Sequence, residues 1–143
     1  MEICSGIYRL ESSKIGAVFA VQGEETVLID TGFPGLSGKI YSELTKLGID
    51  PASISKILLT HHDIDHVGNS AALRSGTGAE IYASQEDIPY IKGEKSRTGV
   101  KKIIQKIVPH ENPVIVYPYP RSGRIGEFTI IKTPGHTPGH VCI

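Results

Sequence analysis

The chain has 143 residues, of which 39% are hydrophobic and 21% are charged, and its 15 basic residues balance its 15 acidic ones. This length fits a single domain spanning 1–143, and the composition is ordinary for a globular protein. The balanced charge gives no overall field to attract nucleic acid or an anionic membrane, and no apolar run reaches the roughly 18 residues of a membrane span. We therefore expect a small-molecule substrate and no nucleic-acid or membrane partner.

The cysteines and the first residues indicate the cellular compartment. Cys4 and Cys142 lie at opposite ends of the sequence without CxxC spacing, which argues against a disulfide framework. Residues 1–4 have neither the basic start nor the apolar run of a signal peptide. We expect a cytoplasmic protein with free thiols.

Short apolar runs bounded by turn residues predict most of the secondary structure. They indicate strands at 7–10, 15–21, 25–30, 56–59, 80–83 and 128–131, and the start of another at 141–143. Val27-Leu28-Ile29 is apolar at every position, so this strand should be covered on both faces. Apolar residues at helical spacing predict helices over 37–47, with Gly48 as its stop, and from Val67 to Leu73.

Two further segments have helical signals. Ser84 followed by Asp87 resembles a capping box, with Ser84 as the cap. Residues 92–108 combine basic residues with apolar residues at helical spacing. This segment is either an anion-binding or lid helix over a pocket, or an amphipathic helix with its basic face in solvent. We favour the second interpretation.

The largest group of potential metal-binding side chains follows the strand at 56–59. Residues 61–66 contain three histidines and two aspartates where a strand gives way to a helix, which is where α/β sheets place their sites. In a tight loop His61, Asp63 and Asp65 alternate and point the same way, and His66 adjoins Asp65. This spacing can serve two adjacent metal ions, and imidazole with carboxylate suits Zn, Fe, Mn or Co.

A second histidine-bearing loop follows the strand at 128–131. His136 lies in the rigid sequence Pro134-Gly135-His136-Thr137-Pro138-Gly139 and can present its ring to the same cavity. We predict His61, Asp65, His66 and His136 as metal ligands. Two ions a few ångströms apart can share a hydroxide that is a strong nucleophile near neutral pH.

Three neighbouring residues have other expected roles. His62 faces away from His61 on an alternating pattern, so we expect it to support the ligands or the fold. His140 either contacts the substrate or has a structural place at the start of a strand. Asp30, at the end of the strand over 25–30, either caps the following loop or orients the histidine loop from behind the ligands.

Three motifs in this order resemble the first three motifs of the metallo-β-lactamase-fold superfamily, in its glyoxalase II and lactonase-like branch. They are Asp30-Thr31-Gly32, His-x-x-x-Asp-His over 61–66, and Pro-Gly-His-Thr-Pro-Gly-His over 134–140. The resemblance implies the α/β class and an αβ/βα sandwich with the metal site at the sheet edges. It also implies one or two ions, typically zinc, with His61 and His136 in site one and Asp65 and His66 in site two.

The sequence departs from the family pattern in two ways. Asp63 replaces the usual second histidine, as in some members that include the di-iron flavodiiron proteins, so we assign it to site one and expect a shift toward Fe or Mn. The later bridging aspartate and last histidine have no counterpart, because the sequence stops at Ile143 inside an apolar run. The resemblance therefore implies a C-terminally incomplete second half.

These residues favour a metal-dependent hydrolase. A metal-bound hydroxide would attack an ester, thioester or lactone-type carbonyl, with Asp65 as the catalytic residue that positions the water. One alternative, motivated by Asp63, is a di-iron or mono-iron redox enzyme. Another is an inactive metal-binding fragment that forms a homodimer through an open sheet edge.

Overall fold

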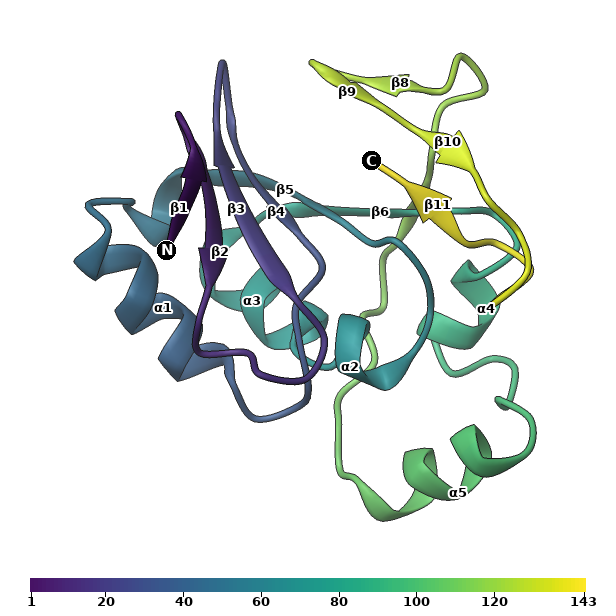
Figure 1. Cartoon of the computed structure of the whole chain (residues 1–143). Coiled ribbons are helices and arrows are strands. Elements are labelled where there is room, and N and C mark those ends of the chain that lie inside the picture. The colour runs from purple at the N-terminus through teal and green to yellow at the C-terminus, as the bar shows by residue number, and fades with distance from the viewer.

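A seven-stranded sheet runs through the middle of the protein (Figure 1). The computed structural model describes residues 1–143, apart from the side chain of Gln105. The strands pair in sequence order, and they are β1 (Glu2–Cys4), β2 (Ile7–Leu10), β3 (Val18–Gln22), β4 (Thr26–Ile29), β5 (Ile54–Leu58), β6 (Glu80–Ala83) and β7 (Tyr117–Pro118). β1 to β4 form an antiparallel meander, whereas β4 to β7 are parallel. The carboxyl ends of the parallel strands therefore share one edge of the sheet.

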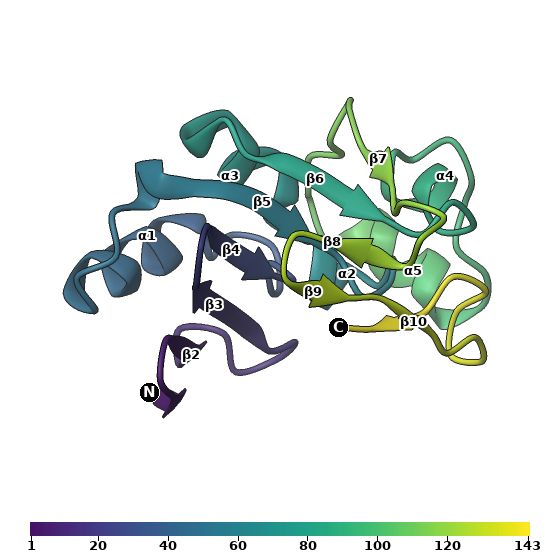
Figure 2. The same cartoon turned by 90° about the horizontal axis from the view of Figure 1, so that it is seen from above.

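Helices cover one face of this sheet. They are α1 (Ser37–Lys46), the 3-10 turn η1 (Pro51–Ser53), α2 (Ile64–Val67), α3 (Ser70–Thr77), α4 (Ile88–Ile91) and α5 (Val100–Ile107). α1 and α3 lie against the sheet, and the larger core between them includes Leu28, Ile40, Leu44 and Leu73 (Figures 1 and 2). The α1 helix predicted from residue 37 is confirmed, with an end one residue earlier than expected.

Two small hairpins cover the opposite face. β8 (Arg124–Ile125) pairs with β9 (Phe128–Thr129), and β10 (Ile131–Lys132) pairs with β11 (Val141–Cys142). Figures 1 and 2 show them over β5 and β6, and a second core of Val27, Leu58, Ile125, Ile130 and Val141 joins the layers. Val27 and Leu28 thus enter different cores, which confirms that β4 is covered on both faces.

Several element boundaries differ from the sequence-based expectations. The strand expected from residue 15 begins at Val18, because Ile15 lies in an exposed turn. The helix expected from Val67 is two helices, α2 and α3, and Asn69 between them binds the start of α1: its side-chain oxygen accepts from the Leu36 nitrogen at 2.9 Å. β1 had no counterpart among the predicted strands.

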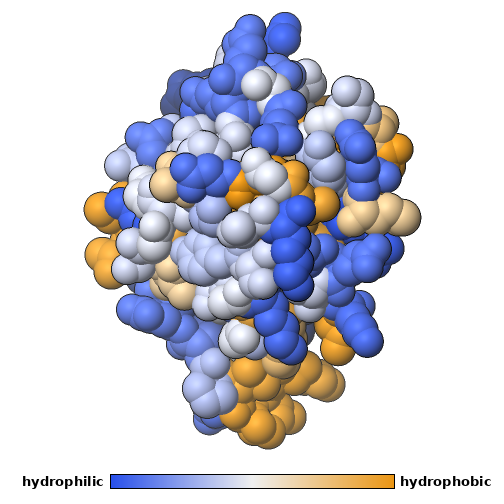
Figure 3. Space-filling view, turned by 90° about the vertical axis from the view of Figure 1, so that its left-hand side faces the viewer, coloured by the Kyte–Doolittle hydropathy of each residue, from blue (hydrophilic) through white to orange (hydrophobic). Residues whose placement is uncertain are grey.

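The α5 helix agrees only in part with the interpretation that we favoured, because Lys102 and Lys106 are exposed to solvent whereas Lys101 is only partly exposed. Its apolar residues are exposed as well, with Val100 71%, Ile103 58% and Ile107 72% exposed, and Lys101 turns toward the histidine loop. Figure 3 shows a hydrophobic area at the lower end of the molecule, where Figure 1 places α5. None of the helices in the described part of the chain has the length and apolar character to cross a membrane.

Candidate metal centre

Asp30 connects the ends of β4 and β5. Its Oδ1 accepts a hydrogen bond from the Thr60 nitrogen at 2.8 Å, and its Oδ2 accepts from the Thr60 hydroxyl at 2.6 Å and lies 2.7 Å from His66 Nδ1. Asp30 is the only described non-glycine residue with positive φ, at 58°, a conformation that aspartate tolerates better than most residues. Of its two predicted roles, the contacts match the orienting one.

Three predicted ligands come together beyond the end of β5. His61, Asp63 and His136 each offer one ligand atom, and these atoms lie within 4.8 Å of one another. Asp63 Oδ2 is 2.7 Å from His136 Nε2 and 3.6 Å from His61 Nε2. The His61 ring is fixed on its other side, where Nδ1 lies 2.9 Å from the Thr60 hydroxyl. Two loops that are far apart in the sequence thus supply one cluster.

The chemistry of this cluster fits a metal ion. Burial alone would raise the pKa of Asp63, but hydrogen bonds from His61, Lys101 and His136 lower that pKa well below its usual range. Asp63 is therefore ionised, and its Oδ1 is buried with no hydrogen-bond partner among the described groups. Two imidazoles and one carboxylate suit Zn, Fe or Mn, and an unpaired buried carboxylate oxygen is costly unless a cation compensates it.

Asp65 and His66 form a neighbouring pair on α2. Asp65 Oδ2 lies 3.5 Å from His66 Nε2, and the His66 ring centroid is 4.1 Å from that of His61. Because Asp30 occupies His66 Nδ1, Nε2 remains available as a ligand. Burial would lower the pKa of His66, but Asp30, Asp65 and Asp63 together raise it above its ordinary value. The pair adjoins the three-residue cluster without belonging to it.

The two other histidines named in advance lie at the margins of the cluster. His62 is buried and turns away from His61: its Nδ1 is 3.2 Å from Asp87 Oδ2, and its ring stacks on Tyr90 at 4.4 Å. His140 lies 5.0 Å from His61 between ring centroids, and its Nδ1 is 2.8 Å from the Thr133 hydroxyl. Burial and the nearby His61 and His136 lower the pKa of His140.

Asp87 is the residue whose role the sequence did not reveal. Its backbone nitrogen donates to Ser84 Oγ at 3.3 Å, so half of the predicted capping box forms, but the carboxylate of Asp87 does not bind back to complete it. Instead, Oδ2 accepts from the His62 nitrogen at 3.1 Å and the Thr137 hydroxyl at 2.8 Å, and Oδ1 accepts from the Gly139 nitrogen at 2.9 Å.

This arrangement ties the two histidine loops together through one fully buried carboxylate. Burial would raise the pKa of Asp87, but its contacts with His62, Thr137 and Gly139 lower it. The partners of Asp87 are 25 to 52 positions away in the sequence, so no local pattern could indicate them.

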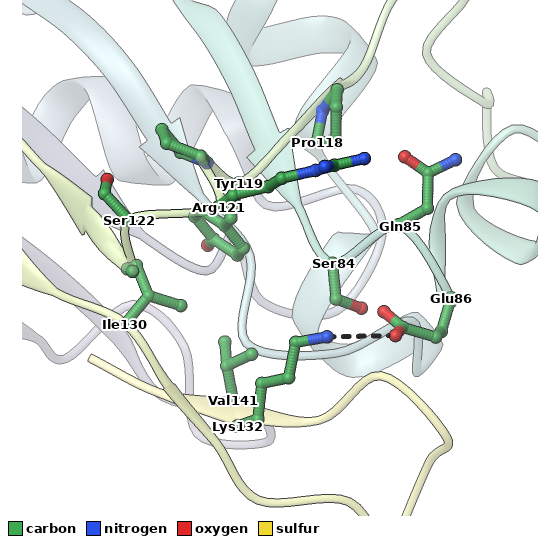
Figure 4. A pocket seen from close by; sticks show the side chains of 12 residues that line it. Ser84, Gln85, Glu86, Pro118, Tyr119, Arg121, Ser122, Ile130, Lys132 and Val141 are labelled. Atoms are coloured by element: carbon green, nitrogen blue, oxygen red, sulfur yellow. Dashed lines mark hydrogen bonds and ion pairs between the residues drawn. The ribbon is translucent and has the colours of Figure 1, made fainter.

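Two cavities flank the β10–β11 hairpin. A cavity of about 550 Å³ has His61, His66 and His140 at one end and apolar side chains such as Phe19, Val21 and Phe128 along its walls. A larger cavity of about 750 Å³ is polar on one side, where Lys132 pairs with Glu86 at 3.1 Å (Figure 4). The described side chains that line this larger cavity include none of the predicted ligands, whereas His61 and His66 line the smaller one.

Known proteins are similar to this chain in sequence and in fold. The chain is 27% identical to "Probable metallo-hydrolase YflN" of Bacillus subtilis, over 99% of the chain and 60% of that protein. It is 31% identical to the hydroxyacylglutathione hydrolase of Enterobacter sp., over 87% of the chain and 40% of that enzyme. BJP-1, a subclass B3 metallo-β-lactamase of Bradyrhizobium japonicum, superposes with a TM-score of 0.83 at 28% identity, over 99% of the chain and 54% of BJP-1.

The chain spans about half the length of these relatives. Within that span the match is continuous, because the family model of the metallo-β-lactamase superfamily covers residues 15–143 and includes both histidine loops. The α/β layers, the cluster at the strand ends and this match agree: the chain belongs to the metallo-β-lactamase superfamily.

Proposed function

We propose that this domain is a metal-dependent hydrolase that cleaves an ester, thioester or lactone-type bond. The observation that carries the proposal is the cluster of His61, Asp63 and His136, whose ligand atoms lie within 4.8 Å of one another. The names of two relatives support it, since one is named a probable metallo-hydrolase and the other a hydrolase of hydroxyacylglutathione, an acylated thiol.

The residues have distinct roles in this proposal. His61, Asp63 and His136 would hold one ion, and Asp65 and His66 would contribute to a second. Zinc suits this donor set, and the carboxylate of Asp63 also favours iron or manganese. A bound ion would polarise the substrate carbonyl and lower the pKa of a water molecule.

Side chains of the site would then assist proton transfer and cleavage of the substrate bond. Asp65 Oδ2 would accept a proton from the attacking water, whose oxygen bonds to the carbonyl carbon. The bond from that carbon to sulfur or oxygen breaks, and the leaving thiol or alcohol takes up a proton. Asp30 would hold the His66 ring in place, since its Oδ2 lies 2.7 Å from Nδ1. The apolar walls of the 550 Å³ cavity would receive the acyl chain, with His140 beside it.

Metal content and hydrolysis test this proposal together. We expect protein purified without chelators to carry Zn, Fe or Mn and to hydrolyse at least one member of a panel of thioesters, lactones and aryl esters. His136→Ala should lose both the metal and the activity. His110→Ala is the matched control, because His110 lies outside the cluster with Nδ1 3.2 Å from the Val108 carbonyl oxygen. Metal-loaded protein that hydrolyses no member of the panel would refute the proposal.

The same preparation tests the alternatives. Bound iron with a visible absorption spectrum would favour the redox enzyme that Asp63 suggested. A metal-binding but inactive dimer in analytical ultracentrifugation would favour the inactive fragment that forms a homodimer through an open sheet edge. The cytoplasmic location remains a prediction.

A further inference from the structure

Lys101 places a positive charge at the mouth of the ligand cluster. Its Nζ lies 2.8 Å from Asp63 Oδ2, the oxygen that His136 Nε2 also contacts at 2.7 Å. The Lys101 side chain is 36% exposed, so solutes can reach it. A lysine is a flexible point charge on a four-carbon stem, and its ammonium can turn to another nearby anion.

The position of α5 over the cluster is fixed by a buried arginine. Arg97 is 2% exposed, and its Nε donates to the His62 carbonyl oxygen at 2.9 Å, with Nη2 donating to the same oxygen. A guanidinium is expensive to bury, so its place under the histidine loop is a specific feature of the fold. Lys101 follows four residues later and is thereby brought to the cluster.

Apolar packing does not account for this placement. Val100, Ile103 and Ile107 on α5 are all more than half exposed. The described contacts from this segment to the histidine loop are ionic and polar, namely Arg97 to His62 and Lys101 to Asp63. The segment therefore places a cation at the site.

We propose that Lys101 binds a carboxylate of the substrate, next to the carbonyl that is hydrolysed. This inference rests on the proposed hydrolase function. A divalent ion bound by Asp63 would repel the Lys101 ammonium and compete with it for the same carboxylate. Lys101 would then be free to pair with an anion of the substrate. The enzyme would thus select acyl groups that carry a second, negatively charged end, such as half-thioesters of dicarboxylic acids.

The test compares two ligands, a dianion and a monoanion, that differ only in whether their second end is a carboxylate or an uncharged amide. Binding of succinate and of its monoamide, succinamate, to the zinc-loaded protein is measured by calorimetry, and hydrolysis of the corresponding thioesters is measured in parallel. The wild type should prefer succinate to succinamate, and the succinyl thioester to the thioester whose second end is an amide. Lys101→Met should weaken the binding of succinate by about 10-fold or more, the loss expected for one charge-assisted hydrogen bond, and should leave the binding of succinamate unchanged.

Lys102→Met is the matched control, since Lys102 is the next residue on the same helix and is exposed. It should keep the wild-type preference, and Lys101→Met should bind zinc at least as tightly as the wild type. A preference that survives in Lys101→Met, an equal loss in Lys102→Met, or no preference in the wild type would overturn the proposal. If neither thioester is hydrolysed, the hydrolase function fails, while the succinate and succinamate binding still decides whether Lys101 receives a carboxylate.

Discussion

Replacing Asp87 by asparagine tests whether one buried carboxylate holds the two histidine loops together. Asp87 is fully buried and accepts from the His62 nitrogen, the Thr137 hydroxyl and the Gly139 nitrogen. Asparagine has the same shape but only one acceptor oxygen, so its amide group must face at least one of these donors. At least one buried N–H then lacks an acceptor, and the remaining bonds lose their charge. We expect the free energy of unfolding to fall by about 2–4 kcal/mol.

The metal site should weaken along with the fold. His61 and His136 belong to the two loops that Asp87 joins, and loss of such supporting hydrogen bonds typically reduces metal affinity by about 10- to 100-fold. Urea unfolding of the metal-free protein measures the first effect, and competition with a chelator measures the second. Glu86→Gln is the control, because Glu86 pairs with Lys132 at the surface, where such a pair contributes about 0–1 kcal/mol.

Either of two results would refute this reasoning. If the Asp87→Asn and Glu86→Gln proteins unfold at the same urea concentration, the buried hydrogen bonds contribute no stability of their own. If Asp87→Asn is less stable but binds zinc as tightly as the wild type, Asp87 supports the fold without fixing the ligands.

Three further substitutions test other parts of the site and its support. Asp30→Asn should lower metal affinity by about 10- to 100-fold in chelator competition, because His66 loses its charged partner while asparagine tolerates the same positive φ. Gly16→Ala should lower the free energy of unfolding by at least ~2 kcal/mol in urea, since its φ is +70° and the new Cβ would lie 1.7 Å from the Asp65 carbonyl oxygen. In Gly38→Ala, in α1, the new Cβ meets nothing within 4 Å, and alanine has a higher helix propensity than glycine. The free energy of unfolding in a thermal melt should therefore rise by about 0.5 kcal/mol, and a decrease would contradict this reasoning.

Patterns contained within one short segment predicted the fold best. The strand expected at 80–83 is β6 with the same bounds, and the helix expected from Ser37 is α1, because a few consecutive residues contain the signal for each. The motif over 61–66 likewise led to a cluster, since the residues at the end of a parallel strand lie at one edge of the sheet. Which ions the predicted ligands bind, and how many, remains a prediction.

Residues that act across long sequence separations escaped prediction. Asp87 resembled the carboxylate partner of the cap Ser84, because the two residues have the spacing of a capping box, and nothing nearby showed that Thr137 and Gly139 would need an acceptor. Lys101 resembled one more lysine of a solvated basic face, because helical periodicity indicates which residues share a face but not which face turns inward. On α5 the apolar residues are exposed together with Lys102 and Lys106, which departs from the usual arrangement of a buried apolar face.

The ligand positions result from protein groups on both sides of the histidine loop. Asp30 accepts from the Thr60 nitrogen at one end of it, and Asp87 accepts from the nitrogen of His62. Arg97 donates to the carbonyl oxygen of His62, so the backbone on either side of His61 is fixed by charged partners in three different segments. The family motif therefore names the ligands, but their geometry depends on residues outside it. A chain with the same motif and without these three partners would have the ligands but no fixed arrangement for them.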